Sequence, residues 1–337
     1  MQNSRLVVEL VGQMENALKV RHYSKRTLQA YSNWIIRFVR YHDFRHPVDL
    51  AEVEINEFLS DLAIKKSIGS SGQNQALAAI LFLYRHVLGR EVGEIGELIR
   101  ARKSKRVPVV MSRTEVQQVI SKLHGRNRLL VEIIYGTRIR LSECLALRVK
   151  EIDFGRNEII VRSGKGDKDR IVMLPISLKS RLRKHLKAVR LLHKNDLLEG
   201  WGCVELPNAL SRKYPSASRE WKWQWVFPQR RRWVDQRSWK EGRHHVNHTV
   251  IQRAVRDAVN RCDLTKHITC HTFRHSFATH LLEGGYDIRT VQQLLGHKSV
   301  KTTMIYTHVL NRGPSGVLSP LDSLAGREGA SRSGEGD

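Results

Sequence analysis

The sequence lacks the features that mark membrane proteins, secreted proteins and metal-binding proteins. No apolar run approaches the roughly 20 residues that a membrane-spanning helix needs, so we expect no contact with a membrane. Glu9 stands where a secretory signal would be apolar. The 4 cysteines are scattered without a C-x-x-C pair, which predicts reduced structural thiols, no metal site and a cytoplasmic location.

Two kinds of catalytic motif are also absent. The sequence has no cluster of carboxylates such as two-metal nucleases use, and no G-x-x-x-x-G-K-[ST] loop that would hold ATP. We therefore predict chemistry that needs no metal, no ATP and no other cofactor.

Acidic residues are few relative to basic ones. The 337 residues include 58 Lys and Arg but only 33 Asp and Glu, which gives a formal net charge of +25. A compact chain with this charge repels itself, so it usually has a polyanionic partner. Because the excess runs along the chain and is not confined to a tail, we favour a nucleic acid over the alternative of a basic protein with solvated lysines.

Helical periodicity dominates residues 1–97. Apolar residues recur at helical spacing in four stretches, which predicts a four-helix bundle with helices at about 5–20, 25–41, 53–64 and 73–88. Ser24 is the expected N-cap of the second helix, and 69–72 is expected to be a loop. Lys25 and Arg26 begin the second helix, and a basic bundle of this kind suits a clamp on DNA.

A basic linker, 98–110, leads to a second domain at 111–324. Ser112 and Glu115 form a capping-box pattern that starts a helix. Two β-rich runs around 158–162 and 170–174 predict a hairpin whose turn carries Lys165. The expected fold is mainly α, with an α+β second domain that holds a small sheet. The tail, 325–337, has no large apolar residue and is predicted to be disordered.

Three residues in the second domain could hold a phosphate. His271 and Arg274 are three apart on a predicted helix and share one face. Arg140 follows an apolar helix. Two guanidiniums can grip the non-bridging oxygens of a phosphodiester, and they stabilise the charge that develops as phosphorus becomes five-coordinate.

Three further residues complete this hypothesis. Tyr306 can attack as an oxygen nucleophile and form a phosphotyrosyl intermediate, provided that nearby cations favour its phenolate. Lys165 can protonate the departing 5′ oxygen, and His297 can donate a hydrogen bond to the phosphate. Each residue alone has a structural alternative, such as a helix cap for His271 or a core aromatic for Tyr306. Their occurrence together favours catalysis.

Six of the seven tryptophans lie in the 198–247 segment, mixed with arginine and histidine. Aromatic rings among cations suit unpaired bases, because any base can stack on a ring. The alternative is a local core, and for any single tryptophan that is the better interpretation. For the cluster as a whole we favour contact with nucleic acid.

In combination, these motifs resemble the tyrosine recombinase (phage integrase) family over nearly the whole chain. The family signature is an arginine in a G-T-G-x-R-x-S-E segment, a hairpin lysine in G-K-G-x-K-x-R, an H-x-x-R, a later G-H and a nucleophilic tyrosine. The resemblance implies catalytic roles for Arg140, Lys165, His271, Arg274, His297 and the nucleophile Tyr306. It also implies that Glu143 supports the first arginine.

Within that family the chain looks most like the integron integrases, which carry an extra segment between the hairpin and the H-x-x-R. The 198–247 segment resembles it, for example at 206–210 and 243–245. The resemblance implies a homotetramer that inserts and excises gene cassettes on folded single-stranded attachment sites. It implies that the DNA contacts of this segment include Trp223, Arg243, His244 and His245.

Arg138 departs from the family pattern, which usually has glycine there. If the backbone at this position has a positive φ, arginine costs roughly 1 kcal/mol, and its charge could compete with Arg140 for phosphate. The simpler alternative is that Arg138 is a tolerated variant.

Three alternatives to an integron integrase also stay open. They are a recombinase of duplex sites of the Xer or phage type, a catalytically impaired DNA-binding relative, and a type IB topoisomerase, which the 198–247 segment fits poorly.

Overall fold

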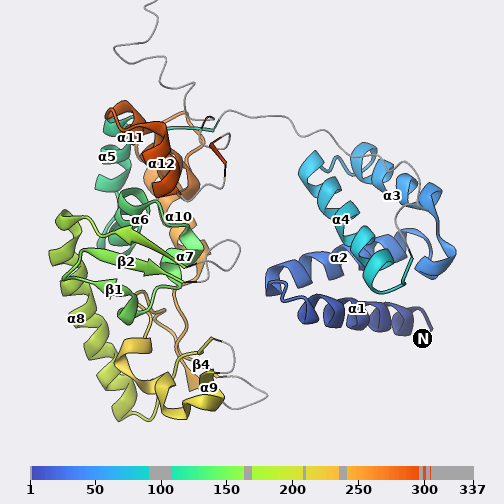
Figure 1. Cartoon of the computed structure of the whole chain (residues 1–337), viewed down its shortest axis with the longest axis horizontal. Coiled ribbons are helices and arrows are strands. Elements are labelled where there is room, and N and C mark those ends of the chain that lie inside the picture. Colours follow the sequence, from blue (N-terminus) through green and yellow to red (C-terminus); the bar gives the residue numbers. More distant parts are fainter. Residues whose placement is uncertain are drawn as a thin grey trace, which may run out of the picture. The chain divides into compact units, whose positions relative to one another are not determined.

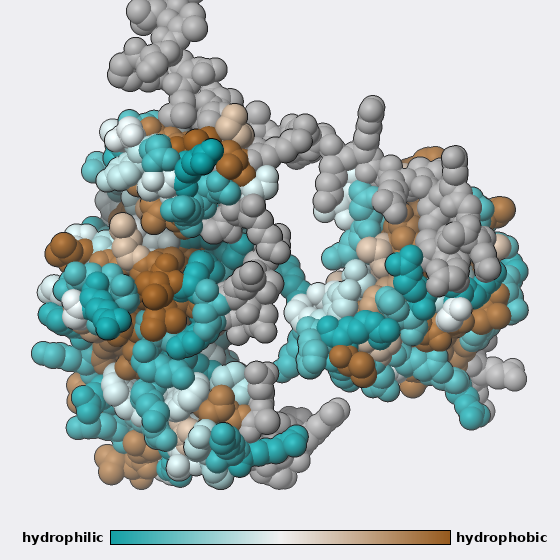
Figure 2. Space-filling model, in the orientation of Figure 1, coloured by the Kyte–Doolittle hydropathy of each residue, from teal (hydrophilic) through white to brown (hydrophobic). Residues whose placement is uncertain are grey.

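The structure, a computed structural model, describes residues 2–90, 108–162, 169–207, 210–234, 241–295, 299–300 and 304. The chain divides into two compact units, Met1–Arg106 and Val107–Asp337, and each is considered by itself (Figure 1). Within the described ranges, no helix combines the length and apolar character needed to cross a membrane. Figure 2 shows hydrophilic residues over most of the visible surface of both units.

The first unit is a helical bundle. Its elements are α1 (Gln2–Val20), α2 (Lys25–Tyr41), the 3-10 turn η1 (Pro47–Asp49), α3 (Glu52–Ile64) and α4 (Ser70–His86). The four predicted helices are confirmed, and the Ser24 hydroxyl caps α2 by accepting the Thr27 N–H at 3.1 Å. The expected loop at 69–72 is wrong. Gly69 is extended and serves as the N-cap, so α4 already begins at Ser70.

One buried tyrosine ties the bundle together. Tyr84 of α4 is fully buried in the core of the bundle. Its hydroxyl lies 2.8 Å from the Pro47 carbonyl oxygen and 3.1 Å from that of Leu50. These contacts satisfy the hydroxyl inside an apolar core, where an unpaired polar group would be costly, and they hold η1 against α4.

The second unit is mainly helical with a small sheet, as predicted, and it holds a second small sheet, of two strands, that was not predicted. Its elements are α5 (Arg113–Ser121), α6 (Gly125–Thr137), α7 (Leu141–Leu145), η3 (Val149–Glu151), β1 (Ile152–Asp153), β2 (Glu158–Val161), β3 (Arg170–Met173), α8 (Ile176–Leu198), α9 (Leu210–Lys213), η4 (Pro215–Arg219), η5 (Trp221–Trp223), β4 (Trp233–Val234), β5 (Glu241–Gly242), α10 (His248–Asn260), α11 (Cys270–Glu283) and α12 (Ile288–Leu295). The capping box that starts α5 is confirmed.

The predicted hairpin is also confirmed and is part of a larger sheet. Strands β2 and β3 pair antiparallel, with Val161 opposite Arg170, and β1 adds a third strand beside β2. The turn of the hairpin, 163–168, lies outside the described residues. So do most of the expected linker and the whole of the expected tail.

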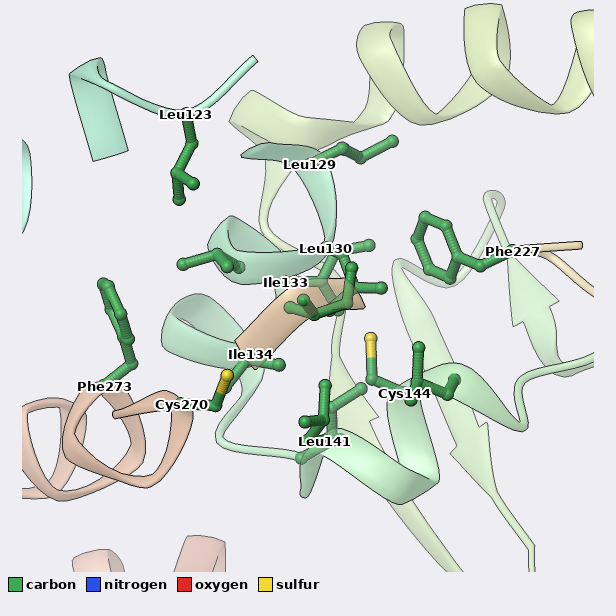
Figure 3. Packing of buried hydrophobic residues seen from close by; sticks show 14 of the residues in the cluster. Leu123, Leu129, Leu130, Ile133, Ile134, Leu141, Cys144, Phe227, Cys270 and Phe273 are labelled. Atoms are coloured by element: carbon green, nitrogen blue, oxygen red, sulfur yellow. The ribbon is translucent and has the colours of Figure 1, made fainter. Parts of the chain in front are cut away.

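Helix α6 lies at the centre of the core of the second unit. Figure 3 shows Leu130, Ile133 and Ile134 of this helix between Cys144 of α7 and Phe273 of α11. All five side chains are at most 1% exposed. Burying such side chains is worth about 1.5–3 kcal/mol each. The core therefore holds together α6, α7 and α11, which carry or adjoin the candidate catalytic residues.

A chain of hydrogen bonds fastens α11 to its surroundings. The Met111 N–H donates to the Ser276 hydroxyl at 2.9 Å, and the Met111 carbonyl accepts from His280 Nε2 at 2.9 Å. Because a carbonyl can only accept, Nε2 of His280 carries the proton. Nδ1 therefore accepts from the Tyr135 hydroxyl of α6, at 2.9 Å. This network fixes α11 against α6 and the start of the unit.

Candidate active site

The turn after α6 positions the first candidate arginine. The chain leaves α6 through Arg138, whose φ of 57° and ψ of 16° lie in the left-handed region. It is extended at Arg140, the N-cap of α7, with φ −70° and ψ 152°. The backbone at position 138 therefore has the positive φ that favours glycine, and an arginine there is strained.

Glu143 of α7 is gripped by two arginines. Its Oε1 accepts from Arg140 Nη1 at 2.6 Å, and its Oε2 accepts from the Arg140 backbone N–H at 2.7 Å. Arg170 of β3 donates to Oε2 at 2.6 Å and to Oε1 at 3.1 Å. Burial alone would raise the pKa of Glu143, but these hydrogen bonds outweigh it and lower the pKa to about 2. The carboxylate therefore stays ionised at neutral pH, as a residue that supports Arg140 must.

Helix α11 brings the H-x-x-R pair to the same place. Burial lowers the pKa of His271, and the positive charges of Arg274 and then Arg140 lower it further. The structure therefore gathers His271, Arg274 and Arg140 within electrostatic reach of one another, although more than 130 positions separate Arg140 from His271 in the sequence. Arg274 also donates a hydrogen bond to the Arg138 carbonyl. This contact links α11 to the turn after α6.

The other three predicted catalytic residues, Lys165, His297 and Tyr306, lie outside the described residues. The described residues end at Arg162 before Lys165 and resume at Asp169. They end again at Leu295, two residues before His297. Their catalytic roles stay predictions.

Arg138 points inward, and the idea that it competes for phosphate is wrong. Its side chain is 4% exposed and donates a hydrogen bond to the Leu295 carbonyl at the end of α12. A guanidinium that is buried against a carbonyl cannot reach a DNA phosphate. Arg138 instead links the turn after α6 to α12.

Replacing Arg138 by glycine should destabilise the protein without raising its activity. Glycine relieves roughly 1 kcal/mol of backbone strain. It also removes a buried side chain and leaves the Leu295 carbonyl without this donor, which costs about 1–3 kcal/mol. We expect a lower free energy of unfolding in urea and no gain in recombination. Arg138→Ala is the matched control, since it loses the same guanidinium and keeps the strain. A more stable or more active Arg138→Gly variant contradicts this interpretation.

Two residues near the site escaped prediction from the sequence. Burial, followed by the charges of His271, Arg274 and Arg138, lowers the pKa of His275 to about 4, so its imidazole is neutral at pH 7. Arg170 is the second partner of Glu143. The available signal for Arg170 was its place as the final arginine of the G-K-G-x-K-x-R motif.

The tryptophans of the 198–247 segment make several contacts within the chain. Trp225 is 8% exposed, in a small core with Val204 and Leu206, and the Arg148 guanidinium lies 3.2 Å from its ring centroid. The local-core alternative is therefore right for Trp225. Trp223 is partly exposed and packs against the same core, with Lys150 Nζ 3.1 Å from its ring centroid.

Arg243 has a structural role in place of the predicted DNA contact. It is 7% exposed, and it donates to both carboxylate oxygens of Asp196, each at 2.7 Å. It also donates to the carbonyls of Gln229 and Arg230. Because Asp196 belongs to α8, Arg243 fastens the segment to that helix. Figure 1 shows α8 running from beside the sheet to α9 and β4 of the segment.

The remaining predicted DNA contacts are more accessible. His244 stacks on Trp233 with ring centroids 4.8 Å apart and 15° between the planes. His245 meets the edge of Trp225 at 5.1 Å. In the first unit, Lys25 and Arg26 are exposed in the first turn of α2, where the helix dipole adds to their attraction for phosphate.

Comparison with known proteins gives the class first. The fold is similar to that of a chain in the crystal structure of a λ integrase tetramer bound to a Holliday junction (TM-score 0.60, 16% identity, 88% of this chain and 76% of that chain). It is also similar to that of the Tn1549 transposon integrase in complex with transposon right end DNA (TM-score 0.57, 14% identity, 95% and 98%). Residues 109–312 match the phage integrase family, and residues 10–94 match the N-terminal SAM-like domain of phage integrases.

Two curated relatives agree with that class. The chain is 49% identical over 317 residues to an integrase/recombinase of Escherichia coli, with 94% of each chain covered. It is 30% identical over 305 residues to the tyrosine recombinase XerC of Lacticaseibacillus casei, with 86% of this chain and 90% of that one covered. The chain belongs to the phage integrase family of tyrosine site-specific recombinases, which cleave and rejoin DNA strands.

Proposed function

We propose that this recombinase is of the integron type, and that it inserts and excises gene cassettes on folded single-stranded attachment sites. The observation that carries this proposal lies in the 198–247 segment, whose described residues include a small core of their own and a salt bridge from Arg243 to Asp196 of α8. We further propose that it acts as a homotetramer on two DNA sites in the cytoplasm. The λ integrase tetramer, which shares the fold, supports the tetramer.

In the proposed reaction, Arg140 and Arg274 hold the scissile phosphate, with His271 beside them. Tyr306 reacts as its phenolate, which the nearby cations favour, and its oxygen bonds to phosphorus as the bond to the 5′ oxygen breaks, which leaves a 3′-phosphotyrosyl intermediate. Lys165 supplies the proton that the departing 5′ oxygen takes up, and His297 donates a hydrogen bond to the phosphate. A free 5′ hydroxyl then attacks the phosphotyrosine and rejoins the strands. The covalent bond keeps the energy, so no ATP is needed.

A cavity in the 198–247 segment supports base binding. It has a volume of about 850 Å³ and is lined by Trp233, His244, Ser211, Glu205 and Glu241 among others. The stacked rings of Trp233 and His244 and the carboxylates of Glu205 and Glu241 among the lining residues suit a planar base that carries N–H donors. Neighbouring Trp223 and His245 extend the aromatic surface that the sequence assigned to extrahelical bases.

The test compares covalent trapping on one folded strand of an attachment site with trapping on the same site as a duplex. We expect Trp223→Ala and His244→Ala to weaken hairpin binding by about 5–150-fold each, because losing one base–aromatic stack costs about 1–3 kcal/mol. Duplex binding should change little. Trp221→Ala is the matched control, since this ring lies in the same η5 turn but faces Arg190 and His193 of α8.

Two outcomes would contradict the proposed integron-type function. If hairpin and duplex bind equally, and neither substitution matters, the protein is a recombinase of duplex sites. If no DNA gives an adduct although both forms bind, the chain is a binding protein without catalysis.

A further inference from the structure

We propose that Arg170 is a positioning residue that joins the stem of the β2–β3 hairpin to the phosphate-binding Arg140 by way of Glu143. This inference rests on the proposed role of Arg140 and deepens it. Arg170 itself is not placed against the substrate, so it is not a catalytic residue.

Arg170 and Arg140 both bind the Glu143 carboxylate, and together they form what we call the Glu143 clamp. Arg170 is the first residue of β3 and pairs with Val161 across the stem, directly after the turn that carries Lys165. Its planar guanidinium meets Glu143 as a fork, with one nitrogen on each carboxylate oxygen, at 2.6 and 3.1 Å. On its other side, the same carboxylate takes the backbone N–H and the side chain of Arg140, at 2.7 and 2.6 Å.

This clamp saturates Glu143. A carboxylate has about four acceptor sites, and each arginine fills two of them. The Glu143 side chain is 9% exposed, so water cannot readily replace a missing donor. Without Arg170, half of the hydrogen bonds to a largely buried carboxylate would be lost, and Glu143 and Arg140 would no longer be held in one orientation.

The positive charge of Arg170 also affects how strongly Arg140 attracts phosphate. One carboxylate shared between two guanidiniums leaves one positive charge uncompensated. If Arg170 were absent, Glu143 would neutralise Arg140 alone, and Arg140 would attract a phosphate less strongly. The chemical step should feel this loss more than DNA binding does, because most of the binding comes from phosphate contacts elsewhere on a basic chain.

The hairpin stem supplies its own control. Arg162 pairs with Asp169 across the same stem at 2.5 Å, but both side chains are about half exposed, 54% and 48%. An exposed pair of this kind contributes little. Arg162→Met and Arg170→Met therefore remove the same side chain from the same stem, and only Arg170→Met breaks a contact with Glu143.

The experiment measures single-turnover cleavage of a suicide DNA substrate by the full chain at saturating DNA, together with DNA affinity by gel shift. We expect Arg170→Met to slow adduct formation by tenfold or more while the affinity changes less than about threefold. Arg170→Lys, which keeps the charge but loses the fork, should lie between wild type and Arg170→Met. Arg162→Met should behave as wild type.

A pH profile separates positioning from simple support of the fold. The charged groups that face Glu143 are Arg140 from its own turn and Arg170 from β3, and Cys144 is its buried neighbour. In the wild type the pKa of Glu143 is about 2, so the group stays ionised between pH 5 and 8. Removing Arg170 raises that pKa, so the cleavage rate of Arg170→Met should fall further as the pH drops towards 5.

Two results would overturn the inference. One is a rate for Arg170→Met equal to that of Arg162→Met, and the other is an equal loss of affinity and rate, which would make Arg170 a DNA contact. If urea titrations show that Arg170→Met is poorly folded, Arg170→Lys is the deciding variant. A wild-type cleavage rate and an intact pH profile for Arg170→Lys would show that the two-pronged contact of Arg170 with Glu143 is not needed. Tyr306→Phe tests the proposed function with Arg170 in place, so the two ideas fail separately.

Discussion

Tyr306→Phe is expected to abolish the covalent protein–DNA adduct and to leave DNA binding intact. Phenylalanine keeps the ring and removes only the oxygen that would bond to phosphorus, so no phosphotyrosyl intermediate can form. Losing a covalent nucleophile lowers the rate by about 10⁴-fold or more. A suicide substrate labelled on the 5′ side of the scissile phosphate shows the adduct as a band of reduced mobility on a denaturing gel, and a gel shift under native conditions reports binding.

Tyr286→Phe is the matched control for this experiment. Tyr286 lies between α11 and α12, its side chain is 55% exposed, and the proposed chemistry does not use it. Wild type and Tyr286→Phe should form equal amounts of adduct. An adduct that persists in Tyr306→Phe would show that another residue is the nucleophile.

Asp196→Ala should produce the largest loss of stability. The carboxylate of Asp196 is buried, and it receives Arg243 on both oxygens at 2.7 Å and Arg232 at 2.8 Å. Breaking such a pair leaves buried guanidinium charge uncompensated, which typically costs about 3–5 kcal/mol. Urea unfolding followed by tryptophan fluorescence measures this loss, because six of the seven tryptophans lie in the segment that Asp196 anchors.

The matched control for this prediction is Glu199→Ala. It removes a second carboxylate that contacts Arg232, at 2.7 Å, but Glu199 is exposed and its loss should change the free energy of unfolding little. Burial would raise the pKa of Asp196, yet the hydrogen bonds from Arg243 and Arg232 outweigh it and lower that pKa. The stabilisation is therefore present above the unfolded pKa of about 3.9 and is lost as the pH falls through the lower folded pKa. Equal stability of the two alanine variants would contradict the anchor.

Local patterns in the sequence were sufficient for the four helices of the first unit, the start of α5 and the β2–β3 hairpin. Ser24 caps α2 and Glu115 completes the capping box of α5 because both interactions span only three residues. The hairpin and the helices follow from periodicity for the same reason. The one clear error, the start of α4, arose because glycine and serine next to a helix suit its N-cap as well as a loop.

The candidate site was only partly accessible to the same reasoning. Motif spacing named Arg140, His271 and Arg274, and the fold gathers them. The spacing could not show that Arg170 shares Glu143 with Arg140, since these partners come from separate elements. Nor could it show that Arg138 turns away from the phosphate site.

The sequence by itself determined the class of protein, the helices of the first unit with the hairpin of the second, and the residue types available for phosphate chemistry. Only the tertiary structure decided which of the 58 basic side chains point inward. Arg243 looks like a DNA contact in the sequence, but it is a buried partner of Asp196, 47 positions away. The physical reason is that the burial and pairing of a charge depend on residues that meet only after folding.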